Sequence, residues 1–454
     1  MGITFVEKGD RTKTRPHAKI ALVLAGGAIS GGAFKIGGLI ALNTLLTNKS
    51  VTDFDIYVGI SAGAFLAAPL AAGIAPEELL KSLDGSSDRI NRFTPLDFYR
   101  PNWREFVRKP LQLGRDATTF LPQASLAVAR RLLNNRPEMI NALRDFVKEP
   151  GLQSAEALLK PFIIDMMRES HLRMGLSYIP SGLFDTAGIE AFTRSNLKKN
   201  NVPNDFRLLN MVRNNTLYIG ATNLNTAEGV TFGHDEDHSV TISEAVAASA
   251  AIPGFYKPAR IRGQDYIDAG VRRTANISQA VKGGASLVIA YNPFRPFVNY
   301  NADQLLNKQA SISDMGIATV INQAFRTMLH TRLLLGIEKL QLNPDFHGDV
   351  ILLEPSETDV KFFNINPLNF WQRAESALHG YVSATEALER HHLRISSILK
   401  TYGIKTDIDR LRQRVELIRR ANYDERTIMK VLQQEMHPPR QTEREQQVPL
   451  RVVR

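Results

Sequence analysis

The chain of 454 residues is long enough to bury a large core, and its 43% hydrophobic and 22% charged residues are typical of a globular protein. Cysteine is absent, which excludes disulfide bonds and thiolate metal sites. The net charge of +10 points to two classes of partner, nucleic acid and an anionic membrane surface. Because the sequence has no zinc-finger, RRM-like or basic-zipper signature, we expect no nucleic acid partner.

Residues 1–18 are polar and basic, which predicts a flexible N-terminus ahead of the folded chain. The apolar run at 20–24 is too short for a membrane-spanning helix of roughly 20 residues. Glycines follow this run where a signal peptide would have a small-residue cleavage site. The absence of an export signal favours the cytoplasm, and delivery by a signal-independent secretion system is the alternative.

Two strand-to-helix units come next, and they predict an α/β fold with a mainly parallel sheet. The first has a buried strand at 20–24, a run of glycines and a helical stretch at 34–46. The second has a strand at 55–58, a tight turn at 59–63 and an alanine-rich helix that ends at Ala72. Further strands are predicted at 217–221, 266–267, 287–291 and 349–353.

Helical patterns dominate two other parts of the chain. Residues 93–179 are mostly helical and basic, and periodicity alone leaves open whether they form a helical cap or insertion or ordinary scaffold helices. Residues 303–340 predict a long helix with Ile321, Phe325, Met328 and Leu335 on one face. Core packing is the default interpretation of that stripe, and a membrane-facing surface is the alternative.

The C-terminal part of the chain is predicted to be helical over 361–437, with helices near 371–400 and 407–435. The polar tail at 438–454 is predicted to be disordered.

The pentapeptide at 59–63, Gly-Ile-Ser-Ala-Gly, lies between a predicted strand and a predicted helix. A Gly-x-Ser-x-Gly elbow in this place exposes the serine oxygen in a strained turn, and Gly59 and Gly63 let the strand and helix backbones approach. The helix N-terminus that follows also favours developing negative charge. We therefore predict that Ser61 is a nucleophile; a tight-turn serine is the alternative.

The glycine-rich run at 26–32 follows the first strand and contains Gly26, Gly27 and Ala28. Backbone N–H groups in such a loop stabilise the oxyanion of a tetrahedral intermediate. The rival interpretation, a nucleotide-phosphate loop, fails because Gly32 and Ala33 replace the lysine and the hydroxyl residue that a Walker motif needs.

Asp268 ends the predicted strand at 266–267, where the edge of a sheet presents catalytic side chains, although an aspartate there is a turn former by default. Arg272 and Arg273 follow it and are candidates for contact with a lipid phosphate, with solvated surface charge as the alternative. The acidic and histidine-containing run at 234–238 lacks metal-ligand spacing, so we expect no metal.

These three features, in this order, resemble the patatin-like phospholipases, whose pattern is a glycine-rich loop, Gly-x-Ser-x-Gly and a distant Asp-Gly-Gly or Asp-Gly-Ala. The stretches at 221–226 and 248–255 are also similar to segments of that family. The resemblance covers about residues 20–292, apart from most of 93–179. Two departures stand out: Ala28 replaces the third glycine of the loop, and no basic residue follows it until Lys35.

The resemblance implies a three-layer α/β/α sandwich, a Ser61–Asp268 dyad that works without histidine, and an oxyanion hole at Gly26, Gly27 and Ala28. Asp268 needs partial desolvation to serve as a base. A triad with a later histidine is the competing arrangement, for which His330 and His379 qualify by position. Both lie in helical patterns, where a solvated or packed histidine is the default.

The predicted organisation is a catalytic domain over 19–360 with the cap or insertion at 93–179 inside it, followed by the helical C-terminal region. The predicted function is cleavage of fatty acyl esters in phospholipids or lysophospholipids, without a cofactor and in peripheral contact with anionic membrane. The alternatives are a soluble ester, thioester or polyester hydrolase, and a catalytically weak lipid-binding protein on the same fold.

Overall fold

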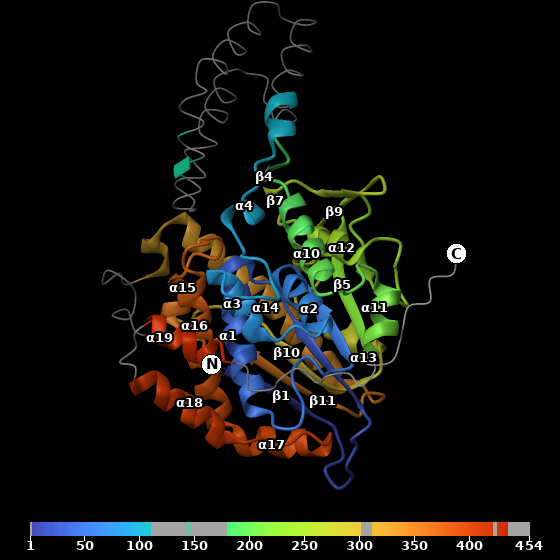
Figure 1. Cartoon of the computed structure of the whole chain (residues 1–454), viewed down its shortest axis with the longest axis vertical. Helices are drawn as coiled ribbons and strands as arrows, with labels where there is room; N and C mark the ends of the chain where they lie inside the picture. The colour runs from blue at the N-terminus through green and yellow to red at the C-terminus, as the bar shows by residue number, and fades with distance from the viewer. Residues whose placement is uncertain are drawn as a thin grey trace, which may run out of the picture.

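The computed structural model describes residues 2–109, 141, 144–145, 179–300, 311–420 and 425–434. A nine-stranded sheet crosses this part of the chain in the order β1-β11-β10-β2-β3-β5-β9-β8, and β6 pairs with β5 beside that path (Figure 1). Its strands are β1 (Gly2–Glu7), β2 (Lys19–Leu24), β3 (Ile56–Gly59), β5 (Thr216–Asn223), β6 (Gly229–Phe232), β8 (Ala259–Ile261), β9 (Gln264–Asp268), β10 (Ala285–Tyr291) and β11 (Asp349–Glu354). A second sheet pairs β4 (Gly182–Phe184) with β7 (Gly254–Tyr256).

The five central strands, β11, β10, β2, β3 and β5, are parallel, and antiparallel pairs lie at both margins. Strand β2 is buried on both faces, which is why its sequence is a continuous apolar run. Ile20 and Leu22 belong to one core cluster, whereas Ala21 and Val23 belong to another on the opposite face. The predicted α/β fold with a mainly parallel sheet is therefore confirmed.

Helices cover both faces of the sheet, which gives the predicted three layers. The face of Ile20 and Leu22 is covered by α1 (Ala28–Leu45), α2 (Ala62–Ala71), α3 (Pro76–Asp84), α10 (Ala187–Lys199), α11 (Phe206–Arg213), α12 (Ile242–Ser249), α16 (Arg373–Arg390), α17 (His392–Thr401) and α18 (Ile408–Arg420). The other face is covered by α13 (Ile277–Lys282) and α14 (Ile317–Leu342). Shorter elements are α4 (Pro95–Phe98), the 3-10 turns at Ala269–Val271 and Ile312–Met315, α15 (Val360–Asn364) and α19 (Glu425–Leu432).

Helix α1 is buried along its whole length because α16 packs directly on its backbone. A β-carbon on Gly37 would lie 1.9 Å from the carbonyl oxygen of Ala377, and one on Gly380 would lie 2.0 Å from that of Phe34. Only glycine allows the two helices to approach so closely. Helix α1 has the length and hydropathy of a membrane span, but 94% of it is buried inside the fold.

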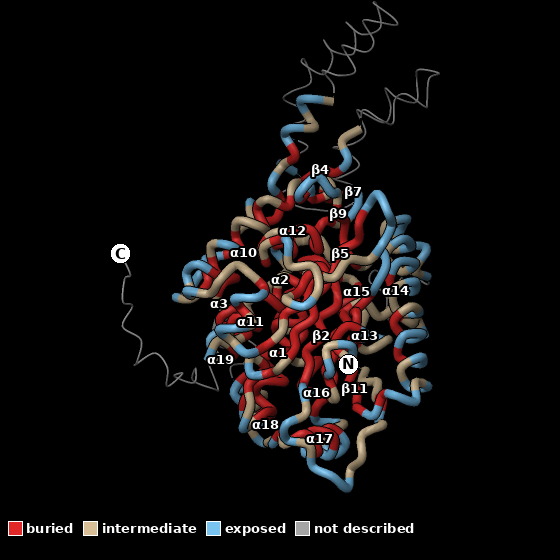
Figure 2. The backbone as a smooth tube through the Cα atoms, turned by 90° about the vertical axis from the view of Figure 1, so that its right-hand side faces the viewer, coloured by how far each residue is buried: buried red, intermediate tan, exposed pale blue. Residues whose placement is uncertain are grey.

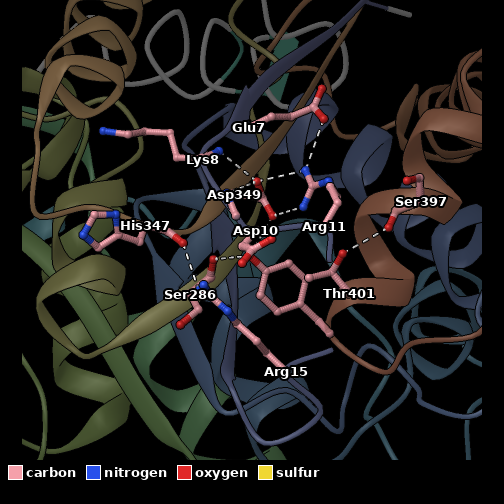
Figure 3. A network of polar contacts seen from close by, with 12 residues as sticks. Glu7, Lys8, Asp10, Arg11, Arg15, Ser286, His347, Asp349, Ser397 and Thr401 are labelled. Carbon is pink, nitrogen blue, oxygen red and sulfur yellow. Dashed lines mark hydrogen bonds and ion pairs between the residues drawn. The ribbon is translucent and has the colours of Figure 1, made fainter. Parts of the chain in front are cut away.

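The N-terminus is ordered, so the predicted flexible segment is wrong for its described residues. Strand β1 pairs antiparallel with β11, from Gly2 opposite Glu354 to Glu7 opposite Asp349. Arg11 then binds both carboxylate oxygens of Asp349, at 2.6 and 3.0 Å (Figure 3). Arg11 thus finds its partner 338 positions away, which local composition does not reveal.

Asp349 is the centre of this network. The backbone N–H groups of Lys8 and Gly9 donate to its Oδ1, and the Tyr402 hydroxyl donates to its Oδ2 at 2.7 Å. Burial opposes ionisation of Asp349, but the hydrogen bonds from Arg11 and Tyr402 hold the pKa of its carboxyl below the ordinary value. The network ties β1, β11 and the end of α17 together.

Helix α14 begins at Ile317, and the predicted residues 303–310 ahead of it lie outside the described part of the chain. The default interpretation of its apolar stripe is wrong. Ile321, Phe325, Met328 and Leu335 are 41%, 58%, 57% and 59% exposed, and the buried residues of α14 are Arg326, Leu333 and Ile337. The helix contacts the sheet through the opposite side (Figure 2).

The two predicted C-terminal helices are each divided, into α16 and α17 and into α18 and α19. Leu388, Leu399 and Leu411 of these helices share one core cluster with the sheet. Most of the predicted cap or insertion at 93–179 lies outside the described residues, as does the tail at 438–454.

Candidate active site

Ser61 lies in the sharp turn between β3 and α2, as the pentapeptide predicts. Its backbone has φ 55° and ψ −126°, in a region that non-glycine residues seldom adopt. The strain is held by its surroundings, since the Ser61 N–H donates to the Ser249 hydroxyl at 2.8 Å and the Ile60 N–H donates to Leu24 at 3.0 Å. The turn thus fixes the serine at the carboxyl edge of the parallel strands.

The two glycines of the pentapeptide are required by close backbone contacts. A β-carbon on Gly63 would lie 2.0 Å from the carbonyl oxygen of Leu24, and one on Gly59 would lie 2.5 Å from the α-carbon of Ala64. Helix α2 can therefore start directly against β2 and β3 only with glycine at both positions.

Asp268 is the last residue of β9, and its carboxyl is near enough to the Ser61 hydroxyl for that hydroxyl to lower its pKa. Its main-chain position is set on two sides, by pairing with Ala221 of β5 and by its N–H, which donates to the carbonyl of Ala251 at 2.9 Å. The Gly270 N–H donates to Oδ1 of the carboxylate at 2.7 Å. The structure therefore brings together two predicted residues that lie more than two hundred positions apart.

Burial raises the pKa of Asp268 to about 6, against the opposing effects of the Ser61 hydroxyl, the Gly270 N–H and the nearby positive charge of Lys35. A carboxylate with this pKa binds a proton more readily than an ordinary aspartate and is still ionised at neutral pH. These are the two properties that a general base needs.

The glycine-rich run is shorter as a loop than predicted, because α1 already starts at Ala28. The N–H groups of Ile29 and Ser30 donate to the carbonyl of Pro367 at 3.0 and 3.2 Å. Within the described residues, no group accepts from the N–H of Gly26, Gly27 or Ala28. Gly26 faces Ser61, since a β-carbon on it would lie 3.8 Å from the serine Oγ. Free backbone donors thus lie beside the serine.

Lys35, one of the departures from the family pattern, reaches back from the second turn of α1 into this loop. Its Nζ donates to the carbonyl of Gly26 at 2.8 Å and also to that of Ala25, and the side chain is fully buried. Burial lowers the pKa of Lys35 to about 7, opposed by the charge of Asp268. The amine fixes the orientation of the peptide units that precede Gly27.

A cavity of about 90 Å³ opens at Ser61, on the side of the sheet covered by α1 and α2. Ser61 and Ala28 line it, and nearly all of its other walls are apolar. The lining includes Phe65, Phe93, Phe98, Phe192, Ile189 and Leu197. Among the described residues that line it, Arg373 is the one with a charged side chain.

The two arginines predicted to contact a lipid phosphate lie away from the cavity at Ser61. Arg272 and Arg273 do not line this cavity; they line a groove beside α14. Arg272 donates to the carbonyl of Ala227 and Arg273 to the side chain of Asn276, both at 2.8 Å. The structure therefore does not bring them to Ser61.

The two histidines that qualified for a triad are engaged by other carboxylates. His330 Nε2 lies 3.2 Å from Glu354, and His379 Nε2 lies 2.8 Å from Asp359. Among the described residues, no group of three or more His, Asp or Glu side chains is arranged to hold a metal ion.

Ser249 is the residue of this site that sequence reasoning missed. It lies in the stretch at 248–255, which entered only as a family resemblance, and it supports the strained Ser61 backbone. A buried serine within an apolar run was the available signal, but its partner is 188 positions away and becomes visible only in the fold.

Comparison with known proteins finds one matching family. The model of the patatin-like phospholipase family matches residues 22–281. Among solved structures, VipD from Legionella pneumophila is 16% identical over 86% of this chain and 70% of VipD, with a TM-score of 0.36. ExoU of the Pseudomonas aeruginosa type III secretion system, solved in complex with SpcU, is 16% identical over 73% of this chain and 54% of ExoU, with a TM-score of 0.25. No curated protein matches the sequence.

Proposed function

Because the chain belongs to the patatin-like phospholipase family, we propose that it is a lipid acyl hydrolase in which Ser61 attacks a fatty acyl ester and Asp268 is the base. One observation carries the proposal: a serine with a strained backbone lies next to a buried carboxylate and lines an apolar cavity. We assign the substrate to phospholipids or lysophospholipids because the cavity walls suit a fatty acyl chain.

The reaction starts when the Ser61 hydroxyl attacks the ester carbonyl and gives its proton to Asp268. The negative charge that develops on the carbonyl oxygen is taken up by the free N–H groups of Gly26, Gly27 and Ala28. Collapse of this intermediate expels the alcohol, which receives the proton from Asp268, and leaves an acyl group on Ser61. Water then gives a proton to Asp268 and attacks the acyl group. The second tetrahedral intermediate collapses, the fatty acid is released, and Asp268 returns the proton to the Ser61 oxygen.

Lys35 supplies the basic side chain that the glycine-rich run at 26–32 itself lacks. Its Nζ binds the carbonyl groups of Ala25 and Gly26, and because a trans peptide unit is planar, the N–H groups of Gly26 and Gly27 point away from the amine. Its charge also stabilises the ionised form of Asp268. We therefore assign Lys35 as a positioning residue of the site.

The proposal is tested by the release of fatty acid from a fluorogenic phospholipid and from a water-soluble short-chain ester. We expect Ser61→Ala and Asp268→Asn to lower both rates by about 10³-fold or more, because each removes one half of the dyad. Ser82→Ala is the matched control, since this serine lines the same cavity but is hydrogen-bonded to the carbonyl of Leu79.

The two substrates separate the alternatives. Cleavage of the soluble ester alone would favour a soluble ester hydrolase, and lipid binding without cleavage of either ester would favour a lipid-binding protein. Release that persists in Ser61→Ala would refute the assigned nucleophile.

A further inference from the structure

Helix α14 lies at the outside of the molecule, where most of its residues are exposed or half-buried (Figure 2). Its exposed residues include a stripe of apolar side chains. At about 100° per residue, its outward arc of about 100° contains apolar side chains along the whole helix. Their exposed fractions are 69% for Ile317, 41% for Ile321, 58% for Phe325, 57% for Met328, 59% for Leu335 and 75% for Leu342. An exposed apolar surface of this length indicates an interaction site.

The same arc carries positive charge and no negative charge. Arg332 and Lys339 fall within it, whereas Glu338, the one acidic residue of α14, lies outside it. Like charges on this stripe disfavour its pairing face to face with a second copy of the chain, although its apolar residues at 321, 328, 335 and 342 have the spacing of a helix pair.

A basic groove adjoins the stripe, between α13 and the C-terminal half of α14. It has a volume of about 960 Å³, and both Leu335 and Leu342 of the stripe line it. Five basic side chains and a single acidic one, Glu338, also line it; the basic ones are Arg272, Arg273, Lys282, Arg332 and Lys339.

Most of this positive charge is not neutralised by a carboxylate. Arg272 and Arg332 donate to backbone carbonyls and Arg273 donates to an amide oxygen, so the three guanidinium groups have neutral acceptors. Of the basic residues in the groove, Lys282 is the one with an ion pair in the described part of the chain, to Glu236. The groove thus offers phosphate-binding charge next to exposed leucines.

Helix α14 is hydrogen-bonded to loops at the carboxyl edge of the sheet, where Ser61 and Asp268 lie and which we call the catalytic edge. Arg332 donates to the carbonyls of Gly270 and Val271, at 3.2 and 2.8 Å, just beyond Asp268. Arg326, which is buried, donates to the carbonyl of Arg295 at 3.1 Å and to that of Pro293, whose ring packs against Gly27. Arg326 and Arg332 therefore place the part of α14 that carries them beside the loops at the edge where Ser61 lies.

We propose that the outward stripe of α14 and the adjoining basic groove form the surface by which the protein docks on an anionic phospholipid bilayer. The apolar side chains enter the interface and the basic ones meet the lipid phosphates, as in interfacial amphipathic helices. The choice of a bilayer as the partner rests on the proposed lipid substrate. Docking on this side brings the catalytic edge to the source of that substrate.

The test measures binding of the full chain, carrying Ser61→Ala so that no turnover is needed, to vesicles of phosphatidylcholine with or without phosphatidylserine. We expect binding to the anionic vesicles to fall at least about tenfold with Phe325→Ser and Met328→Ser combined. Arg272→Gln combined with Arg273→Gln should lower the preference for phosphatidylserine and leave binding to phosphatidylcholine unchanged.

The matched control is Leu208→Ser combined with Met211→Ser on α11, where the two side chains are 50% and 77% exposed. Helix α11 ends just before β5 begins, so it lies at the opposite edge of the sheet. The proposal predicts unchanged binding for this control. Equal loss in both pairs, or no loss with the α14 pair, would overturn it, as would a dimer that the α14 pair dissociates while vesicle binding persists.

A second measurement does not depend on loss of function. Phe325→Trp, in a chain whose two tryptophans Trp103 and Trp371 are replaced by phenylalanine, gives one reporter on the stripe. Its emission should shift to shorter wavelength on anionic vesicles, and an unchanged emission would contradict docking by this face. Because neither measurement requires hydrolysis, a failure of the proposed enzyme activity is distinguishable from a failure of docking.

Discussion

Helices α1 and α14 are both long and apolar, yet α1 is buried at every residue and α14 exposes most of its apolar side chains. The difference lies in their small residues. Glycines at Gly37 and Gly380 let α16 cover α1 at backbone contact, whereas a β-carbon on Gly336, the glycine of α14, would meet nothing within 4 Å. Hydrophobicity alone therefore does not decide which helix is buried. Helix α1 is buried because its Gly37 lets another helix pack against its backbone.

The helices also differ in where they carry charge. In α1, Lys35 is fully buried and works on the catalytic loop from inside. In α14, Lys339 is exposed on the outward face, while the buried Arg326 fastens the helix to the loop at Pro293. The charged residue of α1 therefore acts within the site, whereas those of α14 face the outside or hold the helix against the loop at Pro293.

The largest effect that sharpens this contrast is on stability. We expect Gly37→Ala to lower the free energy of unfolding by about 1 to 3 kcal/mol or more, because the added methyl group would lie 1.9 Å from the carbonyl oxygen of Ala377 and force α16 away. The midpoint of urea unfolding measures this.

Gly336→Ala is the matched control for Gly37→Ala on α14. Its methyl group meets open space, so the gain in helix propensity should raise the free energy of unfolding by about 0.5 to 1 kcal/mol. If both substitutions had the same sign, glycine packing would not be what distinguishes the two helices.

The next effect concerns the buried charge of α1. Lys35→Met should lower kcat by about 10- to 100-fold with little change in KM, because the oxyanion donors lose their orientation while the acyl cavity keeps its walls. Steady-state kinetics on the soluble ester measure this. Lys400→Met, at an exposed lysine at the end of α17, is the control and should leave kcat unchanged. A change confined to KM would contradict the positioning role.

The smallest effect is on pH dependence. Asp268 must be ionised to act as the base, so kcat/KM should fall about tenfold per pH unit below a midpoint near 6. The charge of Lys35 lowers the pKa of Asp268, so in Lys35→Met the midpoint should move to higher pH. A midpoint near 4 would mean that Asp268 is not desolvated, and an unmoved midpoint in Lys35→Met would mean that the two groups do not interact.

Local patterns predicted much of the fold and the elements of the site. The two strand-to-helix units, the turn at Ser61 and the strand ending at Asp268 all follow from short-range features, namely apolar runs, glycines and their order. What failed depended on distant partners. Arg11 pairs with Asp349, and α16 covers α1, across more than 300 positions of sequence. Lys35 reaches only nine positions back to Gly26, but that contact depends on the fold of the loop between β2 and α1.

The stripe of α14 is a second case in which a local pattern was insufficient. Periodicity placed Ile321, Phe325, Met328 and Leu335 on one face but could not tell whether that face meets the core, since a core helix and an interfacial helix share the same pattern.

The central claim, that Ser61 is the nucleophile, is tested most directly by covalent labelling with a fluorophosphonate, which reacts with activated serines. We predict one adduct per chain, located by peptide mass spectrometry on the segment that contains Ser61. The adduct should be absent in Ser61→Ala and should form much more slowly in Asp268→Asn. Labelling that persists in Ser61→Ala, or that maps to another serine, would contradict the account.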